Sequence, residues 1–187
     1  MKQGSWAIAM VLALAVLAIG RNALAVTGQL ELFADSHATS CALADAPGLI
    51  SVFVFQTAGE ASTAVGWFAA PKPACWNATW IADNVSNATK VGGSQTAISV
   101  GFGICRPLPA FVLEILFISA GATPPCCEYS LTVPQGKTLA YLVCDTFWEQ
   151  PLTIGRKVTI NPDASCPCML PVATEASTWG RVKSLYR

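Results

Sequence analysis

Charge is scarce in this sequence, and neither sign dominates. Only 12% of the 187 residues are charged, with 11 Lys and Arg side chains against 11 Asp and Glu. Without a run of basic residues, the chain lacks the electrostatic surface that attracts nucleic acids or anionic membranes, so we expect neither as a partner. The hydrophobic content of 53% excludes an intrinsically disordered chain. The sequence therefore predicts one folded domain of ordinary size.

Motifs of common catalytic sites are absent. The chain contains no GxSxG, HExxH, Walker-type, dinucleotide-binding glycine or CxxCH haem motif. Its only histidine, His37, lies in a polar stretch with no motif around it, which is typical of a surface residue rather than a catalytic base. We therefore predict no catalytic residue and no cofactor.

Paired carboxylates are a remaining route to catalysis, because glycosidases use two acids that face one cleft. The positions of the acids along the chain do not show which two of them would face the same cleft. Glu114 stands out because it lies inside an apolar run. It is either a buried acid with a raised pKa or a carboxylate at a sheet edge or paired with an arginine such as Arg106, and we favour the second. The candidate acids are Asp35, Asp45, Glu60, Asp83, Glu114, Glu128, Asp145 and Glu149.

Long apolar runs are confined to the N-terminus. Lys2 precedes an apolar stretch over residues 6–19, and Ala23-Leu24-Ala25 is a small-residue cleavage site. This order predicts a signal peptide over residues 1–25 rather than a membrane anchor, because a spanning helix needs about 20 apolar residues. We therefore expect a secreted protein of the cell surface, the extracellular space or the periplasm, with no membrane span after cleavage.

Cysteine is abundant, with 8 residues that all follow the predicted cleavage site. An even number in an exported chain favours four disulfides, although spacing does not select among the pairings. Adjacent Cys126 and Cys127 can hardly bond each other, so we expect them to reach two separate segments. A thiolate metal site is less compatible with export, which favours oxidised cysteines. A redox-active pair is less compatible with the prolines around Cys166 and Cys168, and we predict neither site. The cysteines are Cys41, Cys75, Cys105, Cys126, Cys127, Cys144, Cys166 and Cys168.

Short apolar runs alternate with clusters of Gly, Pro, Asn and Ser, which is typical of many strands in a sandwich or a barrel. In the run 96–105, Ile98, Val100, Phe102 and Ile104 share one face, which we predict to be buried. Further strands are predicted over residues 30–33, 64–69, 78–81, 129–133, 138–144 and 152–160.

Two other runs, 49–55 and 111–118, are apolar on both faces. This pattern predicts central strands that are covered on both sides. Together the runs amount to about nine strands. We therefore predict an all-β fold over residues 26–168: an antiparallel β-sandwich, immunoglobulin-like in general shape, that is stapled by disulfides.

The end of the chain differs in kind. Residues 169–176 are a predicted linker, and residues 177–187 a predicted amphipathic tail that forms a short helix. This tail is either a docking or sorting tag or a terminal helix that packs on the sandwich, and we favour the helix. A helix this short is marginal alone in water, so it needs a contact. The residues at helical spacing are Trp179, Val182, Leu185 and Tyr186.

Several segments resemble a group of cysteine-rich exported bacterial proteins that have no assigned activity. The residues that carry this resemblance are CWNATW over 75–80, GSQTAISVG over 93–101, PPCC over 124–127 and NPDASCPC over 161–168. The segment TWGRVK over 178–183 is similar to the ends of other exported bacterial chains. The resemblance implies a bacterial origin and a recurring cysteine pattern, and it brings no reaction or ligand with it.

Trp67, Trp76 and Trp80 gather in a turn-rich region. Such rings can stack on sugars from a sheet face, or they can fill a core, which we favour. We expect a non-catalytic structural or adhesive protein at the cell exterior, whose apolar strands bind a protein partner or a second copy. The alternative is a carbohydrate-binding module that uses exposed tryptophans and has a glycan partner, and the third is a secreted hydrolase built on carboxylates.

Overall fold

The computed structural model describes residues 27–168 and contains strands and turns but no helix within that range. Accordingly, this part of the chain has no helix that could cross a membrane. The predicted signal peptide (1–25), linker (169–176) and C-terminal tail (177–187) lie outside the described residues. The strands are β1 (Gly28–Phe33), β2 (Ala42–Leu43), β3 (Gly48–Ala58), β4 (Ser62–Phe68), β5 (Ala78–Asn84), β6 (Thr89–Gly93), β7 (Ala97–Arg106), β8 (Ala110–Ser119), β9 (Cys127–Tyr129), β10 (Ala140–Val143), β11 (Glu149–Ile154) and β12 (Val158–Ile160).

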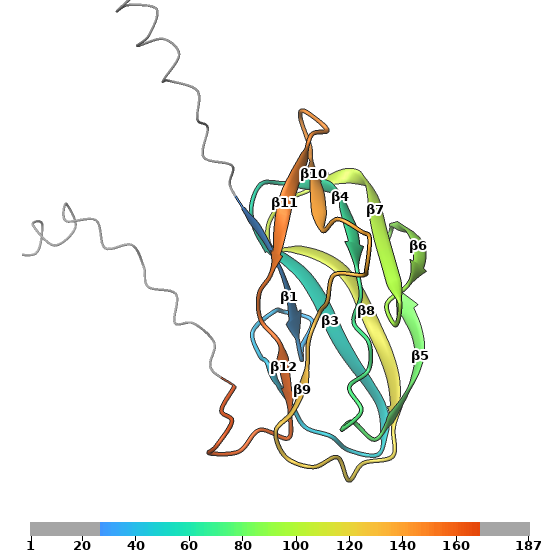
Figure 1. Ribbon diagram of the computed structural model, residues 1–187, viewed down its shortest axis with the longest axis vertical. Coiled ribbons are helices and arrows are strands. Elements are labelled where there is room, and N and C mark those ends of the chain that lie inside the picture. Colours follow the sequence, from blue (N-terminus) through green and yellow to red (C-terminus); the bar gives the residue numbers. More distant parts are fainter. Residues whose placement is uncertain (1–26, 169–187) are drawn as a thin grey trace, which may run out of the picture.

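Nine of these strands join in the order β5-β8-β3-β1-β11-β10-β4-β7-β6, and this order folds back on itself into a sandwich. β11 connects the two layers because it pairs with β1 on one side and with β10 on the other. β3 and β8 lie at the back in Figure 1, and β10, β4 and β7 lie in front. The predicted all-β, disulfide-stapled sandwich is confirmed.

A small sheet in the order β2-β12-β9 covers the lower part of the sandwich in Figure 1. Tyr129 of β9 contacts Phe117 of β8, with the ring centroids 5.8 Å apart. The Tyr129 hydroxyl donates a hydrogen bond to the Ala70 carbonyl at 2.8 Å, and burial raises the pKa of this phenol. The small sheet therefore seals the core where the front layer ends.

Two details of the predicted sandwich differ from the structure. β1 runs parallel to β11 and β2 runs parallel to β12, so the sandwich is not wholly antiparallel. The immunoglobulin-like shape is not supported, because the nine strands join continuously through β11, whereas an immunoglobulin fold has two separate sheets. Hydrophobic alternation indicates which side chains face a core but not which strand lies beside which, so it could not reveal either feature.

The predicted strand over residues 152–160 is two strands, β11 and β12. Gly155 separates them, and its backbone lies so close to Glu31 that an added Cβ would stand 2.7 Å from the Glu31 Cγ. β2 and β6 were not predicted. β2 has two residues, and nearly all of β6 is exposed, so neither carries an apolar alternation.

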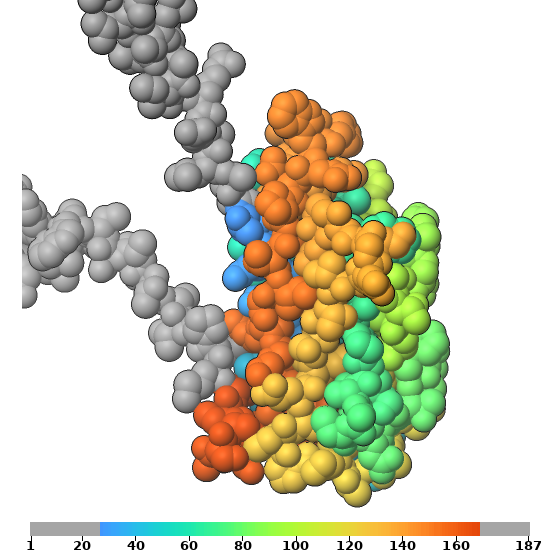
Figure 2. Space-filling view, viewed as in Figure 1, coloured from blue at the N-terminus to red at the C-terminus, as the bar shows by residue number. Residues whose placement is uncertain are grey.

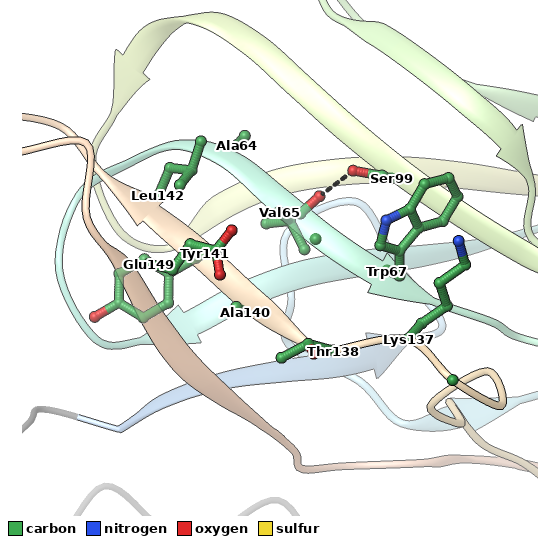
Figure 3. A pocket seen from close by; sticks show the side chains of 12 residues that line it. Ala64, Val65, Trp67, Ser99, Lys137, Thr138, Ala140, Tyr141, Leu142 and Glu149 are labelled. Atoms are coloured by element: carbon green, nitrogen blue, oxygen red, sulfur yellow. Dashed lines mark hydrogen bonds between the residues drawn. The ribbon is translucent and has the colours of Figure 1, made fainter.

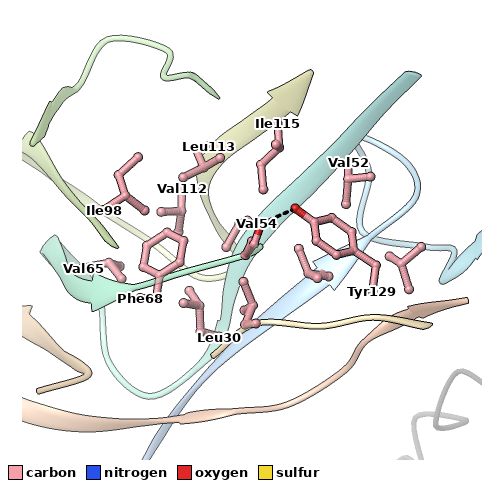
Figure 4. Close-up of a cluster of buried hydrophobic side chains, with 14 of the residues drawn as sticks. Leu30, Val52, Val54, Val65, Phe68, Ile98, Val112, Leu113, Ile115 and Tyr129 are labelled. Carbon is pink, nitrogen blue, oxygen red and sulfur yellow. Dashed lines mark hydrogen bonds between the residues drawn. The ribbon is translucent and has the colours of Figure 1, made fainter. Parts of the chain in front are cut away.

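The core lies between the layers and consists of aliphatic and aromatic side chains (Figure 4). Val52 of β3 and Leu113 and Ile115 of β8 are fully buried there. The prediction that these two strands are covered on both sides is wrong, because Leu49 and Ile118 are 69% and 51% exposed. One face of β3 and β8 is therefore core, and the other is an apolar surface.

In β7 the predicted alternation holds as far as Phe102 and then fails. Phe102 is buried, but Ile104, which we placed on the same buried face, is 62% exposed. Gly103 adopts a positive φ of 69°, and the pairing with β4 loses its register beyond Gly101. Such an irregularity turns the following side chain to the other side of the strand, which explains the error.

All eight cysteines lie in the described range, and none is free. The bridges close loops of 39 to 127 residues, so they join segments that are distant in the sequence. The neighbours at 126 and 127 bond different segments. The pairs are Cys41–Cys168, Cys75–Cys127, Cys105–Cys144 and Cys126–Cys166.

Candidate functional site

The outward face of β3, β8 and β5 is apolar. Leu49 lies opposite Ile118 in the β3–β8 register, and the residues that alternate with them face the core. A bulge in β5 leaves Ile81 45% exposed between the residues that pair with Phe117 and Leu116. We call Leu49, Phe53, Ile81, Leu116 and Ile118 the outer apolar face. Apolar side chains that adjoin one another on a surface mark an interaction site, whereas scattered ones do not.

Glu114 borders the outer apolar face, where it is in register with Phe53. It is half-buried, and its Oε2 accepts a hydrogen bond from the Asn84 side-chain amide at 3.0 Å. Arg106, the partner that the sequence suggested, instead donates to the Ser86 carbonyl at 2.8 Å. Glu114 is therefore a carboxylate held by a neighbouring amide and not a deeply buried acid.

Toward β1 the same side of the sheet carries three phenylalanines in edge-to-face contact. The rings of Phe33 and Phe55 are 5.7 Å apart, and those of Phe55 and Phe111 are 5.6 Å apart. The Arg156 guanidinium lies 5.0 Å from the centre of the Phe33 ring. Since Phe33 and Phe55 are buried, the exposed apolar side chains on this side of the sheet are those of β3, β8 and β5.

The three tryptophans named above lie in different surroundings. Trp76 is 1% exposed, its ring lies 4.3 Å from that of Phe117, and its indole N–H donates to Asp45 at 3.2 Å. Trp80 is 38% exposed on the edge strand β5. Trp67 is half-buried on β4 and lines a pocket. The fold therefore separates the tryptophans: Trp76 lies in the core, Trp80 lies at a sheet edge, and Trp67 lines a pocket.

The pocket at Trp67 lies on the outward side of β4 and β10 and has a volume of about 410 Å³ (Figure 3). The Lys137 ammonium lies 4.4 Å from the centre of the Trp67 ring. Glu149 lies at the opposite end of the pocket, beside Tyr141. Lys137 was missed at the sequence level, because nothing around it marks a site and only the pairing of β4 with β10 brings it to Trp67.

Asp45 organises a polar network at one end of the sandwich. Its carboxylate accepts hydrogen bonds from the Trp76 indole at 3.2 Å, from the Thr123 backbone N–H at 3.1 Å and from the Ser119 hydroxyl. Burial opposes ionisation, but hydrogen bonds from Ser119, Thr123 and Trp76 hold the pKa of the Asp45 carboxyl below its ordinary value. The network ties the loop before β3 to the end of β8, so its role is structural.

Acid should remove the contribution of Asp45 to stability. Because its folded-state pKa lies below the unfolded value of about 3.9, the stabilisation is complete above that value and is lost as the pH falls through the folded pKa. Asp45→Asn should lower the free energy of unfolding at neutral pH by about 2 kcal/mol and flatten its acid dependence. Urea unfolding across the acid range measures both. Asp145→Asn at an exposed site is the control, and an equal effect there would contradict the prediction.

The candidate acids of a hydrolase are not paired in either of two concave sites. The pocket at Trp67 contains one carboxylate, Glu149, and a hollow of about 630 Å³ between β1 and β12 contains one, Glu31. His37 is exposed, and its backbone N–H donates to the Asp35 side chain at 2.8 Å. Since glycosidases need two acids in one cleft, neither hollow offers the required arrangement.

One cluster of metal-ligand atoms occurs in residues 27–168. The side-chain ligand atoms of Cys126, Asp163 and Cys166 lie within 4.8 Å of one another. The two sulfurs are bonded to each other, so they are not thiolates that could bind a metal ion. The Asp163 carboxylate is occupied by Ser165, whose backbone N–H and hydroxyl both donate to it at 2.7 Å.

No family model and no curated protein matches this sequence. Among solved structures, the chain is similar to a chain from the third cohesin ScaC of Acetivibrio cellulolyticus in complex with the ScaB dockerin, with 14% identity, a TM-score of 0.47, and 72% of this chain and 99% of the other covered. It is also similar to the seventh ScaB type I cohesin of Pseudobacteroides cellulosolvens, with 10% identity, a TM-score of 0.45, and 77% and 97% covered. A third is the non-cellulosomal cohesin of the archaeon Archaeoglobus fulgidus, with 13% identity, a TM-score of 0.41, and 74% and 93% covered.

Proposed function

We propose that the protein is a secreted, non-catalytic structural or adhesive protein that assembles outside the cell by binding a second copy of itself. The observation that carries this proposal is the outer apolar face, where Leu49, Ile81 and Ile118 are exposed on neighbouring strands. Four disulfides suit a protein that keeps its shape in an oxidising exterior.

A second copy fits this face for electrostatic reasons. Glu114 lies at its border, and that carboxylate already accepts a hydrogen bond from Asn84. Without the predicted signal peptide, which contains Lys2 and Arg21, the chain has 9 basic and 11 acidic side chains and a formal net charge of −2, so two copies repel each other only weakly at long range. In a two-fold arrangement the same apolar patch is used on both copies, which requires no complementary surface elsewhere.

The cross-strand pairing of the apolar side chains also favours this assembly. Leu49 and Ile118 lie opposite each other on adjacent strands, so they form a continuous apolar row rather than isolated side chains. Burying such a row removes apolar area from water at about 25 cal/mol per Å². Side chains from two sheets pack in this way inside ordinary β-sandwiches.

Charged substitutions in the outer apolar face should abolish the association. We expect Ile118→Glu and Leu49→Glu each to weaken it by about 30-fold or more, because each places a charge where an apolar side chain would be buried. Sedimentation equilibrium over a range of protein concentrations measures the dissociation constant. Ile104→Glu is the matched control, since Ile104 is 62% exposed on β7, outside the outer apolar face.

Two outcomes would overturn this proposal. One is a wild-type protein that remains monomeric at every concentration tested. The other is an equal effect of Ile104→Glu and Ile118→Glu, which would place the contact elsewhere. All three glutamate variants keep the inner residues of their strands unchanged, and circular dichroism would establish that they fold.

A further inference from the structure

We propose that the pocket at Trp67 binds an acidic saccharide, a pyranose that carries a carboxylate. Trp67 is the platform for the apolar face of the ring, Lys137 pairs with the carboxylate, and Glu149 accepts hydrogen bonds from hydroxyls. This proposal does not depend on self-association, because the two surfaces belong to different strands. The pocket is lined by residues of β4 and β10, and the outer apolar face belongs to β3, β8 and β5. β10 and β4 lie in front of β3 and β8 in Figure 1, and the orange segment that contains β10 lies on the face shown in Figure 2.

The local backbone turns Trp67 out of the core. Val65 and Phe68 of the same strand are fully buried, and the register between β4 and β7 shifts between them. This irregularity leaves Trp67 on the outward side, half-buried and lining the pocket. Its indole N–H has no hydrogen-bond partner in the described part of the chain, whereas the indoles of Trp76 and Trp80 both have one. Trp67 therefore offers a ligand both a ring face and a free donor.

Two glycines set the backbone around the pocket. At Gly66, an added Cβ would stand 3.0 Å from the Ala140 carbonyl oxygen, so a larger residue would push β4 away from β10. Gly136 adopts a positive φ of 70° in the turn that places Lys137, whose backbone N–H donates to the Pro134 carbonyl at 3.1 Å. The resulting volume of about 410 Å³ lies in the range of small-molecule sites.

The two charges of the pocket point to the chemistry of its ligand. Lys137 and Glu149 sit at opposite ends, and neither forms an ion pair with any residue of the range 27–168 (Figure 3). An ammonium held only by an aromatic ring can pair with a ligand carboxylate without breaking an existing ion pair. Thr138 also lines the pocket and adds a hydroxyl. The Ser99 hydroxyl donates to the Val65 carbonyl at 3.0 Å and can still accept a hydrogen bond from a sugar hydroxyl (Figure 3). A carboxylated pyranose can stack on the Trp67 ring, pair with the Lys137 ammonium and donate its hydroxyls to the oxygen atoms of the pocket.

Calorimetric titration with two probes tests the proposal on the full exported chain. The first probe is an oligogalacturonate, and the second is its fully methyl-esterified form, which keeps the ring but loses the charge. We expect the acid to bind about fivefold or more tightly than the ester, with an affinity that falls as salt rises. Lys137→Met should remove this preference, and Trp67→Ala should weaken binding of both probes at least about tenfold.

Matched variants separate the pocket from the rest of the surface. Trp80→Ala and Lys157→Met change an exposed tryptophan and an exposed lysine outside the pocket and should leave binding unchanged. Failure of both probes to bind the wild type, equal binding of acid and ester, or an unchanged affinity in Trp67→Ala would each overturn the proposal. Because Ile118→Glu affects only the outer apolar face, its sugar affinity should equal that of the wild type whether or not the protein self-associates.

Discussion

Reduction of the four disulfides is expected to unfold the protein at neutral pH and room temperature. The bridges close loops of 39 to 127 residues. In the chain-entropy relation, each bridge of this kind adds about 4 to 5 kcal/mol by restricting the unfolded chain. Their combined contribution exceeds the roughly 5–15 kcal/mol by which domains are stable. Circular dichroism during titration with a reducing agent should record loss of the β-sheet spectrum.

Replacing one disulfide at a time separates two contributions to stability, the restriction of the unfolded chain and the packing of the cysteine side chains in the core. Cys75–Cys127 and Cys105–Cys144 close loops of 52 and 39 residues, so the entropic losses should be nearly equal, at about 4 kcal/mol. Cys127 is also buried in the core, whereas Cys105 is exposed. Replacing the first pair with alanine should therefore cost about 1 kcal/mol more than replacing the second. If reduced and oxidised protein unfolded at the same urea concentration, the result would contradict the prediction that the bridges stabilise the fold by restricting the unfolded chain.

Trp76→Ala should lower the free energy of unfolding by about 4 kcal/mol. The side chain is fully buried, and its ring contacts those of Phe117 and Tyr129 at centroid distances of 4.3 and 5.6 Å. Its removal leaves a cavity where the small sheet meets β8. It also takes one hydrogen-bond donor from Asp45. Urea unfolding followed by circular dichroism measures the loss.

Two further variants divide this effect into packing and hydrogen bonding. Trp76→Phe keeps an aromatic ring in the core but removes the indole donor, so we expect a smaller loss of about 1–3 kcal/mol. Trp80→Ala is the control at a tryptophan that is 38% exposed, and it should cost about 1 kcal/mol. A loss at Trp80 as large as that at Trp76 would show that the core is not centred where the structure places it.

Alternation in the sequence was sufficient to locate most of the strands. The runs 49–55 and 111–118 lie within β3 and β8, and the run 96–105 overlaps β7 with each end shifted by one residue. Alternation failed where the backbone departs from a regular strand. Ile104 faces solvent because Gly103 interrupts the pleat, and Gly155 divides one predicted strand into two. Such departures depend on contacts with distant residues, which a local pattern does not contain.

The candidate sites were harder to predict from the sequence than the strands were. Leu49 and Ile118 look like core residues, because they belong to runs that are apolar on both faces. Their exposure follows from the absence of a further layer over that side of the described sheet. Trp67 was a candidate from its residue type alone. Its relation to Lys137 arises from the antiparallel pairing of β10 with β4, two strands far apart in the chain.

By itself the sequence determined the class of this protein: a β-rich, cysteine-rich chain with an export signal as its predicted start and no catalytic motif. These properties are local or compositional, so they can be read without knowing which segments meet. Tertiary structure alone decided that Cys75 bonds Cys127, that β1 runs parallel to β11, and that one side of β3 and β8 faces water. Each of these depends on pairing between distant segments, and such pairing is selected by the packing of the whole core.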